Sequence, residues 1–183
     1  MAGLNARRAA GVLADDVKVF ERLGYQPREH GSSFAATLDA PDGGRGLVLR
    51  LHREGRVFGG NWALEITTAE PVLPASGRGL SGRGRGVVHQ QGVRFRAHRG
   101  DDAGAALADA LSEDTALGRA LGEVHFEHVA VDPAGHPVIR HLGGSLVWFA
   151  FPPVRRATPL PPGQPEAIVA ALEAFARAGE RLR

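Results

Sequence analysis

The sequence predicts an α+β fold in which a mostly antiparallel sheet carries helices on one face. Segments near both ends repeat apolar residues with the period of a helix, central segments alternate apolar and polar residues as strands do, and short turn sequences join neighbouring strands. The chain has 183 residues, which is most simply one α+β domain over residues 1–183. A Gly/Arg/Pro-rich linker, residues 71–86, separates two possible lobes, 1–70 and 87–183.

The N-terminal part predicts a helix followed by three strands. Residues 4–23 carry one apolar stripe, and Gly24 follows where a helix C-cap belongs. The turn Pro41-Asp42-Gly43-Gly44 favours a hairpin between the first two strands, because Asp-Gly adopts positive φ at little cost. The three strands are predicted at residues 33–39, 46–53 and 61–69.

After residue 70 the pattern changes from loop to strand. Residues 77–86 alternate glycine with arginine, which favours a flexible basic loop. Residues 87–98 alternate apolar and polar side chains and predict a long basic strand.

The rest of the chain predicts more helices and strands. Ser112 is a plausible N-cap, and residues 152–162 form a proline-rich crossing. Helices are predicted at 102–111, 113–121 and 165–182, and strands at 124–131, 136–142 and 145–151. A helix followed by three strands thus occurs twice, around residues 4–69 and 102–151, as in two diverged α-β-β-β halves.

The composition excludes several classes of protein. Cysteine is absent, which removes disulfides, thiolate nucleophiles and cysteine-ligated metal centres. The longest wholly apolar run, residues 146–154, contains two prolines and is far shorter than a membrane span. An apolar stretch at residues 9–14 ends at Asp15, before a signal-peptide core is complete. We therefore expect a soluble cytoplasmic protein with no membrane partner.

Positive charge is concentrated in residues 71–100. Abundant arginine with scarce lysine is typical of GC-rich bacterial genomes, but such a bias does not explain this clustering. The stretch has no acidic residue, and its basic and titratable residues are Arg78, Arg83, Arg85, His89, Arg94, Arg96, His98 and Arg99.

Alternation along the predicted strands places basic side chains on one face of the sheet. If those strands are neighbours, their exposed faces form a surface that binds an anionic small molecule or an acidic protein through charge-assisted hydrogen bonds. The alternative is that the arginines solubilise the face and discourage edge pairing. The predicted anion-binding surface consists of Arg50, His52, Arg83, Arg85, Arg94, Arg96 and His98.

No motif identifies a reaction or a nucleic-acid partner. The sequence lacks a helix-turn-helix pattern and an RNA-binding signature, so nucleic acid is not the expected ligand. The glycine-rich segments lack the Lys-Ser/Thr of phosphate-binding loops, and Ser145 lacks a nucleophile elbow. We expect a non-catalytic binding or accessory protein with no cofactor.

An enzyme is one alternative. Two predicted neighbouring strands are crowded with possible metal ligands, and two or three of these could meet across the hairpin: His125, Glu127, His128, His136 and His141. The enzyme alternative uses His125, Glu127 and His128 at a metal or acid–base site. His125 and His128 are three residues apart, however, and a regular strand sends such residues to opposite faces.

A carrier of a hydrophobic ligand is a second alternative. The stretch Leu146–Phe151 is apolar on both faces and must therefore be covered on both. Its cover is either the chain's own helices, a second copy in a homodimer, or a hydrophobic ligand held near Trp148 and Phe151.

Three stretches stand out in the C-terminal third: Leu142-Gly143-Gly144-Ser145-Leu146-Val147-Trp148, Phe151-Pro152-Pro153 and Thr158-Pro159-Leu160-Pro161. They resemble a family of small bacterial proteins of unknown function. The resemblance implies a bacterial, non-secreted domain and no catalytic residue.

Overall fold

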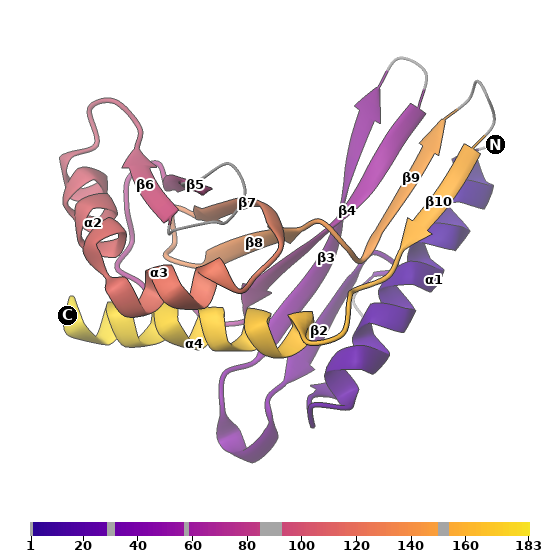
Figure 1. Ribbon diagram of the computed structural model, residues 1–183, viewed down its shortest axis with the longest axis horizontal. Helices are drawn as coiled ribbons and strands as arrows, with labels where there is room; N and C mark the ends of the chain where they lie inside the picture. The colour runs from indigo at the N-terminus through magenta and orange to yellow at the C-terminus, as the bar shows by residue number, and fades with distance from the viewer. Residues whose placement is uncertain (1, 29–31, 57–58, 85–92, 150–153) are drawn as a thin grey trace. The chain divides into compact units, whose positions relative to one another are not determined.

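The computed structural model describes residues 2–28, 32–56, 59–84, 93–149 and 154–183 (Figure 1). Within these ranges the chain forms four α-helices and ten strands, and the strands pair antiparallel, which confirms the predicted α+β fold. No helix in the described ranges is long and apolar enough to cross a membrane.

The chain divides into two compact units. Unit 1 comprises Met1–Ala69 and Arg140–Pro165, and unit 2 comprises Glu70–Ile139 and Glu166–Arg183. These units differ from the predicted lobes because the chain returns to unit 1 at Arg140. Unit 1 therefore combines the first predicted α-β-β-β half with the end of the second.

Unit 1 is a sheet with one helix against it. The core side of the sheet contains Leu49, Leu64 and Ile66, all fully buried, and α1 contributes Phe20 from its apolar stripe. The predicted hairpin is confirmed: the turn η1 (Pro41–Gly43) has positive φ at Asp42 and joins two paired strands. In sheet order, unit 1 contains β1 (Gln26–Pro27), β2 (Ala35–Asp39), β3 (Leu47–Arg56), β4 (Gly59–Thr68), β9 (Ser145–Phe149) and β10 (Val154–Thr158), with α1 (Ala2–Glu21).

Unit 2 contains strands of the ten-stranded sheet, with helices packed on them. Strand β5 pairs with β6 on one edge and with β7 on the other. Phe95 of β6 meets Phe175 of α4 edge-on, with ring centroids 5.8 Å apart. The elements are β5 (Leu80–Gly84), β6 (Val93–Ala97), α2 (Asp102–Glu113), α3 (Thr115–Gly122), β7 (Phe126–Val131), β8 (Pro137–His141) and α4 (Gln164–Arg181), of which β8 and α4 each have two residues in unit 1.

Two strands lie where the sequence predicted irregular chain. β5 falls in the glycine-arginine segment, and it forms because Gly82 allows a close approach: a Cβ there would lie 2.6 Å from Val129 Cγ1 and 2.9 Å from Phe95 Cε1. β10 falls in the proline-rich crossing and pairs along its length with β9. Of the strand predicted at residues 87–98, residues 93–97 are confirmed as β6, and residues 87–92 lie outside the described ranges.

Ser112 does not have its predicted capping role. Asp114 caps α3 instead, and its carboxylate accepts hydrogen bonds from the main-chain N–H groups of Ala116 and Leu117. Ser112 lies in the last turn of α2 and accepts the main-chain N–H of Phe95 at 2.9 Å. Helix α2 therefore covers the outer edge of β6.

Candidate anion-binding site

Three exposed arginines share the solvent face of β5 and β6 in unit 2. Arg83 is directly opposite Arg94 in the antiparallel register, and Ser81 is opposite Arg96. Opposed residues point to the same face of a sheet, and so do residues two apart in one strand. Arg83, Arg94 and Arg96 therefore form one cluster, here called the arginine face, and all three are exposed.

The arginine face has no acidic partner among the described residues. The ion pairs found in the described part of the chain involve other arginines and Lys18. No described carboxylate lies within 4.0 Å of the guanidinium nitrogens of Arg83, Arg94 or Arg96. Like charges directly opposite each other destabilise an antiparallel pair. The free protein thus has a repulsion between Arg83 and Arg94 that a bound anion would relieve.

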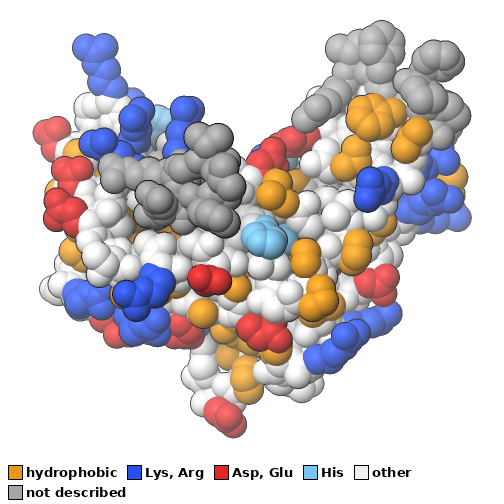
Figure 2. Space-filling view, in the orientation of Figure 1, with side chains coloured by type: hydrophobic (Ala, Val, Ile, Leu, Met, Phe, Trp, Pro, Cys, Tyr) orange, Lys and Arg blue, Asp and Glu red, His pale blue; other side chains and the backbone are white. Residues whose placement is uncertain are grey.

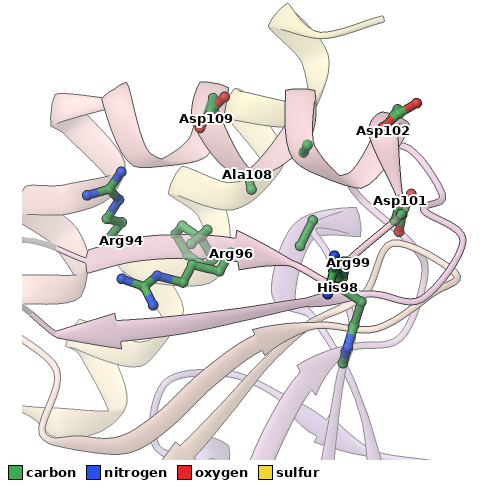
Figure 3. A pocket seen from close by; sticks show the side chains of 12 residues that line it. Arg94, Arg96, His98, Arg99, Asp101, Asp102, Ala108 and Asp109 are labelled. Carbon is green, nitrogen blue, oxygen red and sulfur yellow. The ribbon is translucent and has the colours of Figure 1, made fainter.

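An open pocket of about 380 Å³ adjoins the arginine face along β6. Arginine side chains gather over this part of unit 2 in Figure 2. The basic side chains that line the pocket come from β6 and the turn after it, and they are Arg94, Arg96, His98 and Arg99 (Figure 3).

The acidic residues of the pocket come from α2 and its N-cap. Both carboxylate oxygens of Asp101 accept hydrogen bonds from the main chain. Its Oδ1 accepts the N–H of Gly104 at 2.9 Å, and its Oδ2 accepts the N–H of Arg78 at 3.1 Å. Asp102 and Asp109 are exposed, and in Figure 3 both extend from α2, while Arg94 and Arg96 extend from the strand below. The pocket therefore has a basic wall along β6 and an acidic rim on the helix.

Arg50 and His52 belong to unit 1, where both are exposed on β3. β3 pairs with β2 and β4, and β6 pairs with β5, so these basic strands are not paired neighbours and the condition for one shared basic surface is not met. β2 and β4, its neighbours in sequence, occupy the two edges of β3. Arg85 lies outside the described residues.

The face that carries Arg50 has mixed charge. Arg50 is directly opposite Glu65, and on the same unit Arg140 donates to Glu65 Oε1 from Nη2 at 2.6 Å and to Glu54. These two glutamates are mostly buried and hold the Arg140 guanidinium between them. This part of the predicted surface is thus not a purely basic one.

The enzyme alternative, which uses His125, Glu127 and His128, gains no support from the arrangement of these residues. Glu127 and His128 are consecutive in β7 and point to opposite faces, and His125 precedes the strand. Over the described ranges, no three His, Asp or Glu side chains are placed to hold a metal ion.

The apolar stretch at β9 is only partly covered. Leu146 is buried, Trp148 is half-buried, and Phe149 is 45 % exposed beside Val154, its cross-strand neighbour on β10. Phe151 lies outside the described residues. The homodimer and the hydrophobic carrier both stay predictions.

A comparison with models of protein families identifies the family to which the chain belongs. Residues 21–178 match the model described as "Protein of unknown function (DUF3156)". The chain belongs to the DUF3156 family. The expected membership of a family of unknown function is therefore confirmed, and the match extends well beyond the C-terminal third to include the arginine face. No curated protein and no solved structure matches the chain.

This DUF3156 protein also has a buried polar cluster in unit 1, formed around His141 and Asp16. His141 is 1 % exposed; its Nδ1 accepts the main-chain N–H of Gly143 at 2.7 Å, so Nε2 carries the ring hydrogen and donates to Gln164 Oε1 at 2.9 Å. Both ring nitrogens are occupied and the ring is buried, so His141 stabilises the turn after β8.

Asp16 of α1 belongs to the same region. A Cβ added to Gly144 would lie 2.8 Å from Asp16 Oδ2, and that oxygen has no hydrogen-bond partner among the described residues. Burial, and secondarily the charge of Asp15, raise the pKa of Asp16 from 3.8 to about 7. The burial of Asp16 could have been predicted from the sequence, because Asp16 falls on the apolar stripe three residues after Leu13 and four before Phe20.

Proposed function

We propose that this DUF3156 protein is a non-catalytic binding protein that recognises an anionic ligand on the arginine face of unit 2. Its basis is the direct opposition of Arg83 and Arg94 on an exposed face with no described carboxylate between them. Arg96 adds a third guanidinium, and His98 extends the basic wall into the pocket. Guanidinium groups bind phosphate and carboxylate oxygens through paired, charge-assisted hydrogen bonds.

The ligand class follows from this chemistry. A phosphorylated small molecule or an acidic segment of a protein supplies the oxygen acceptors that such a cluster needs. The proposal keeps the expectation of a bacterial, cytoplasmic protein and includes no reaction and no cofactor.

Thermal unfolding with pyrophosphate tests the proposal. A ligand that binds only the folded state raises the unfolding temperature, and attraction between exposed charges weakens as salt screens it. We expect pyrophosphate to raise the melting temperature at low ionic strength and to lose this effect at high ionic strength. The increase should be smaller in Arg83→Gln, Arg94→Gln and Arg96→Gln.

Matched controls are available in the same unit. Arg119 on α3 and Arg177 on α4 are exposed arginines outside the arginine face. Arg119→Gln and Arg177→Gln remove the same charge and should keep the full increase. Equal increases in the Arg94 and Arg177 variants would show that the anion binds non-specifically.

A further inference from the structure

We infer that the arginine face binds an extended acidic segment of a partner protein, with carboxylates on alternate residues of that segment. The inference rests on the anion-binding function proposed above and adds the class of partner.

The two arginines of β6 repeat with the period of a strand. Arg94 and Arg96 occupy successive outward positions, and His98 follows two residues later in the turn. A strand rises about 3.4 Å per residue, so outward positions recur roughly every 6.8 Å. An extended peptide has the same rise and presents alternate side chains on one face. Acidic residues at alternate positions of such a peptide therefore meet these cations in register.

A compact anion uses only part of this pattern. Arg83 and Arg94 are directly opposed, which places their Cβ atoms about 5 Å apart, so one phosphate group can contact both. Arg94 and Arg96 are two residues apart, or roughly 6.8 Å along the strand. One phosphate group that contacts Arg83 and Arg94 leaves Arg96 without an acceptor, whereas alternate carboxylates of an extended segment reach both Arg94 and Arg96.

A single-stranded nucleic acid also has regularly spaced charges, but its bases need partners. Proteins that bind single strands stack the bases on exposed aromatic side chains. Unit 2 has three aromatic residues, Phe95, Phe126 and Phe175, and all three are buried. Unit 2 therefore offers the bases of a single strand no exposed Phe, Tyr or Trp ring, which favours a peptide.

A second copy of this chain does not supply the acidic segment. No two acidic residues of the sequence lie two positions apart, and the described strands that contain an acidic residue, β2, β3, β4 and β7, contain one each. The partner is therefore a different protein.

Peptide binding to the full-length chain tests the inference. Two labelled peptides of identical composition are compared by fluorescence anisotropy at low ionic strength: one alternates Glu with Thr, and the other groups its Glu residues together. We expect the alternating peptide to bind at least about threefold more tightly, since in-register pairs each contribute a modest amount. Arg94→Gln and Arg96→Gln should each lower its affinity, whereas Arg177→Gln should not.

The affinities of the protein for pyrophosphate and for a thymidine oligonucleotide are measured in parallel. Equal affinity for the two peptides, or tighter binding of the oligonucleotide, overturns the inference. If pyrophosphate binds in an arginine-dependent way and neither peptide does, the inference fails while the proposed anion-binding function stands. If no anion binds, both fail.

Discussion

The hydroxyl of Ser112 accepts the main-chain N–H of Phe95 at 2.9 Å and donates to the carbonyl of Ala108 at 2.6 Å. A side chain of α2 thereby satisfies a backbone donor on the outer edge of β6, where no further strand is described. An open strand edge invites pairing with other chains, so this contact protects the edge. It also fixes α2 beside β6, and these two elements line the pocket.

Ser112→Ala should destabilise the protein by about 1–3 kcal/mol, because the half-buried Phe95 N–H loses its acceptor. Urea unfolding followed by circular dichroism measures the change. Ser33→Ala is the control, since Ser33 is exposed and forms no described hydrogen bond, and we expect it to stay within about 0.5 kcal/mol of the parent. Equal stability of the two variants would show that the edge contact contributes nothing.

Removing one arginine from the arginine face should stabilise the ligand-free protein. Arg83→Gln relieves the repulsion with Arg94 while the strand pairing stays intact, and cross-strand pairs contribute about 0.2–1 kcal/mol. Urea unfolding at low ionic strength measures the gain, and high salt should abolish it because the charges are exposed. Arg177→Gln should change stability little. A loss of stability in Arg83→Gln at low salt contradicts the proposed repulsion.

Much of the fold could be predicted from local patterns. α1, β2, β3, β4 and α4 lie close to their expected ranges because each has a continuous apolar period. β5 could not be predicted that way. Its glycines give no period, and its formation depends on Val129 and Phe95, which approach Gly82 from other strands.

The candidate site was predictable only in part. Alternation correctly placed Arg94 and Arg96 on one exposed face of a strand. It gave no information on which strands are neighbours, because pairing between segments distant in sequence depends on tertiary contacts. Arg83 belongs to the site through the pairing of β5 with β6, whereas Arg50 lies on β3, which pairs with β2 and β4.

Gly82→Ala and Gly118→Ala should have effects of opposite sign. At Gly82 a Cβ would overlap Val129, so overpacking should destabilise the protein by about 1–3 kcal/mol. Gly118 lies inside α3 with open space around its Cα, so alanine should stabilise by about 0.4–1 kcal/mol. Urea midpoints of the two variants measure both effects. A Gly82→Ala protein as stable as the parent would contradict the close approach of β5 to its neighbours.

The buried carboxyl of Asp16 should make stability decrease as pH rises. Its pKa is about 7 in the folded protein and 3.8 ordinarily, so between pH 4 and 7 the folded state holds a proton that the unfolded state has released. The unfolding free energy therefore falls with pH across that window and is unaffected by this group above it. The total effect is on the order of 4 kcal/mol.

Asp16→Asn removes this titration while the side chain keeps its size. We expect the stability of the variant relative to the parent to increase from pH 4 to pH 7 and then to level off. Denaturant unfolding at several pH values measures the difference, and Glu21→Gln, an exposed change on the same helix, is the control. If the difference between the Asp16 variant and the parent is the same at pH 4 and pH 8, the carboxyl does not hold a proton in the folded state at neutral pH.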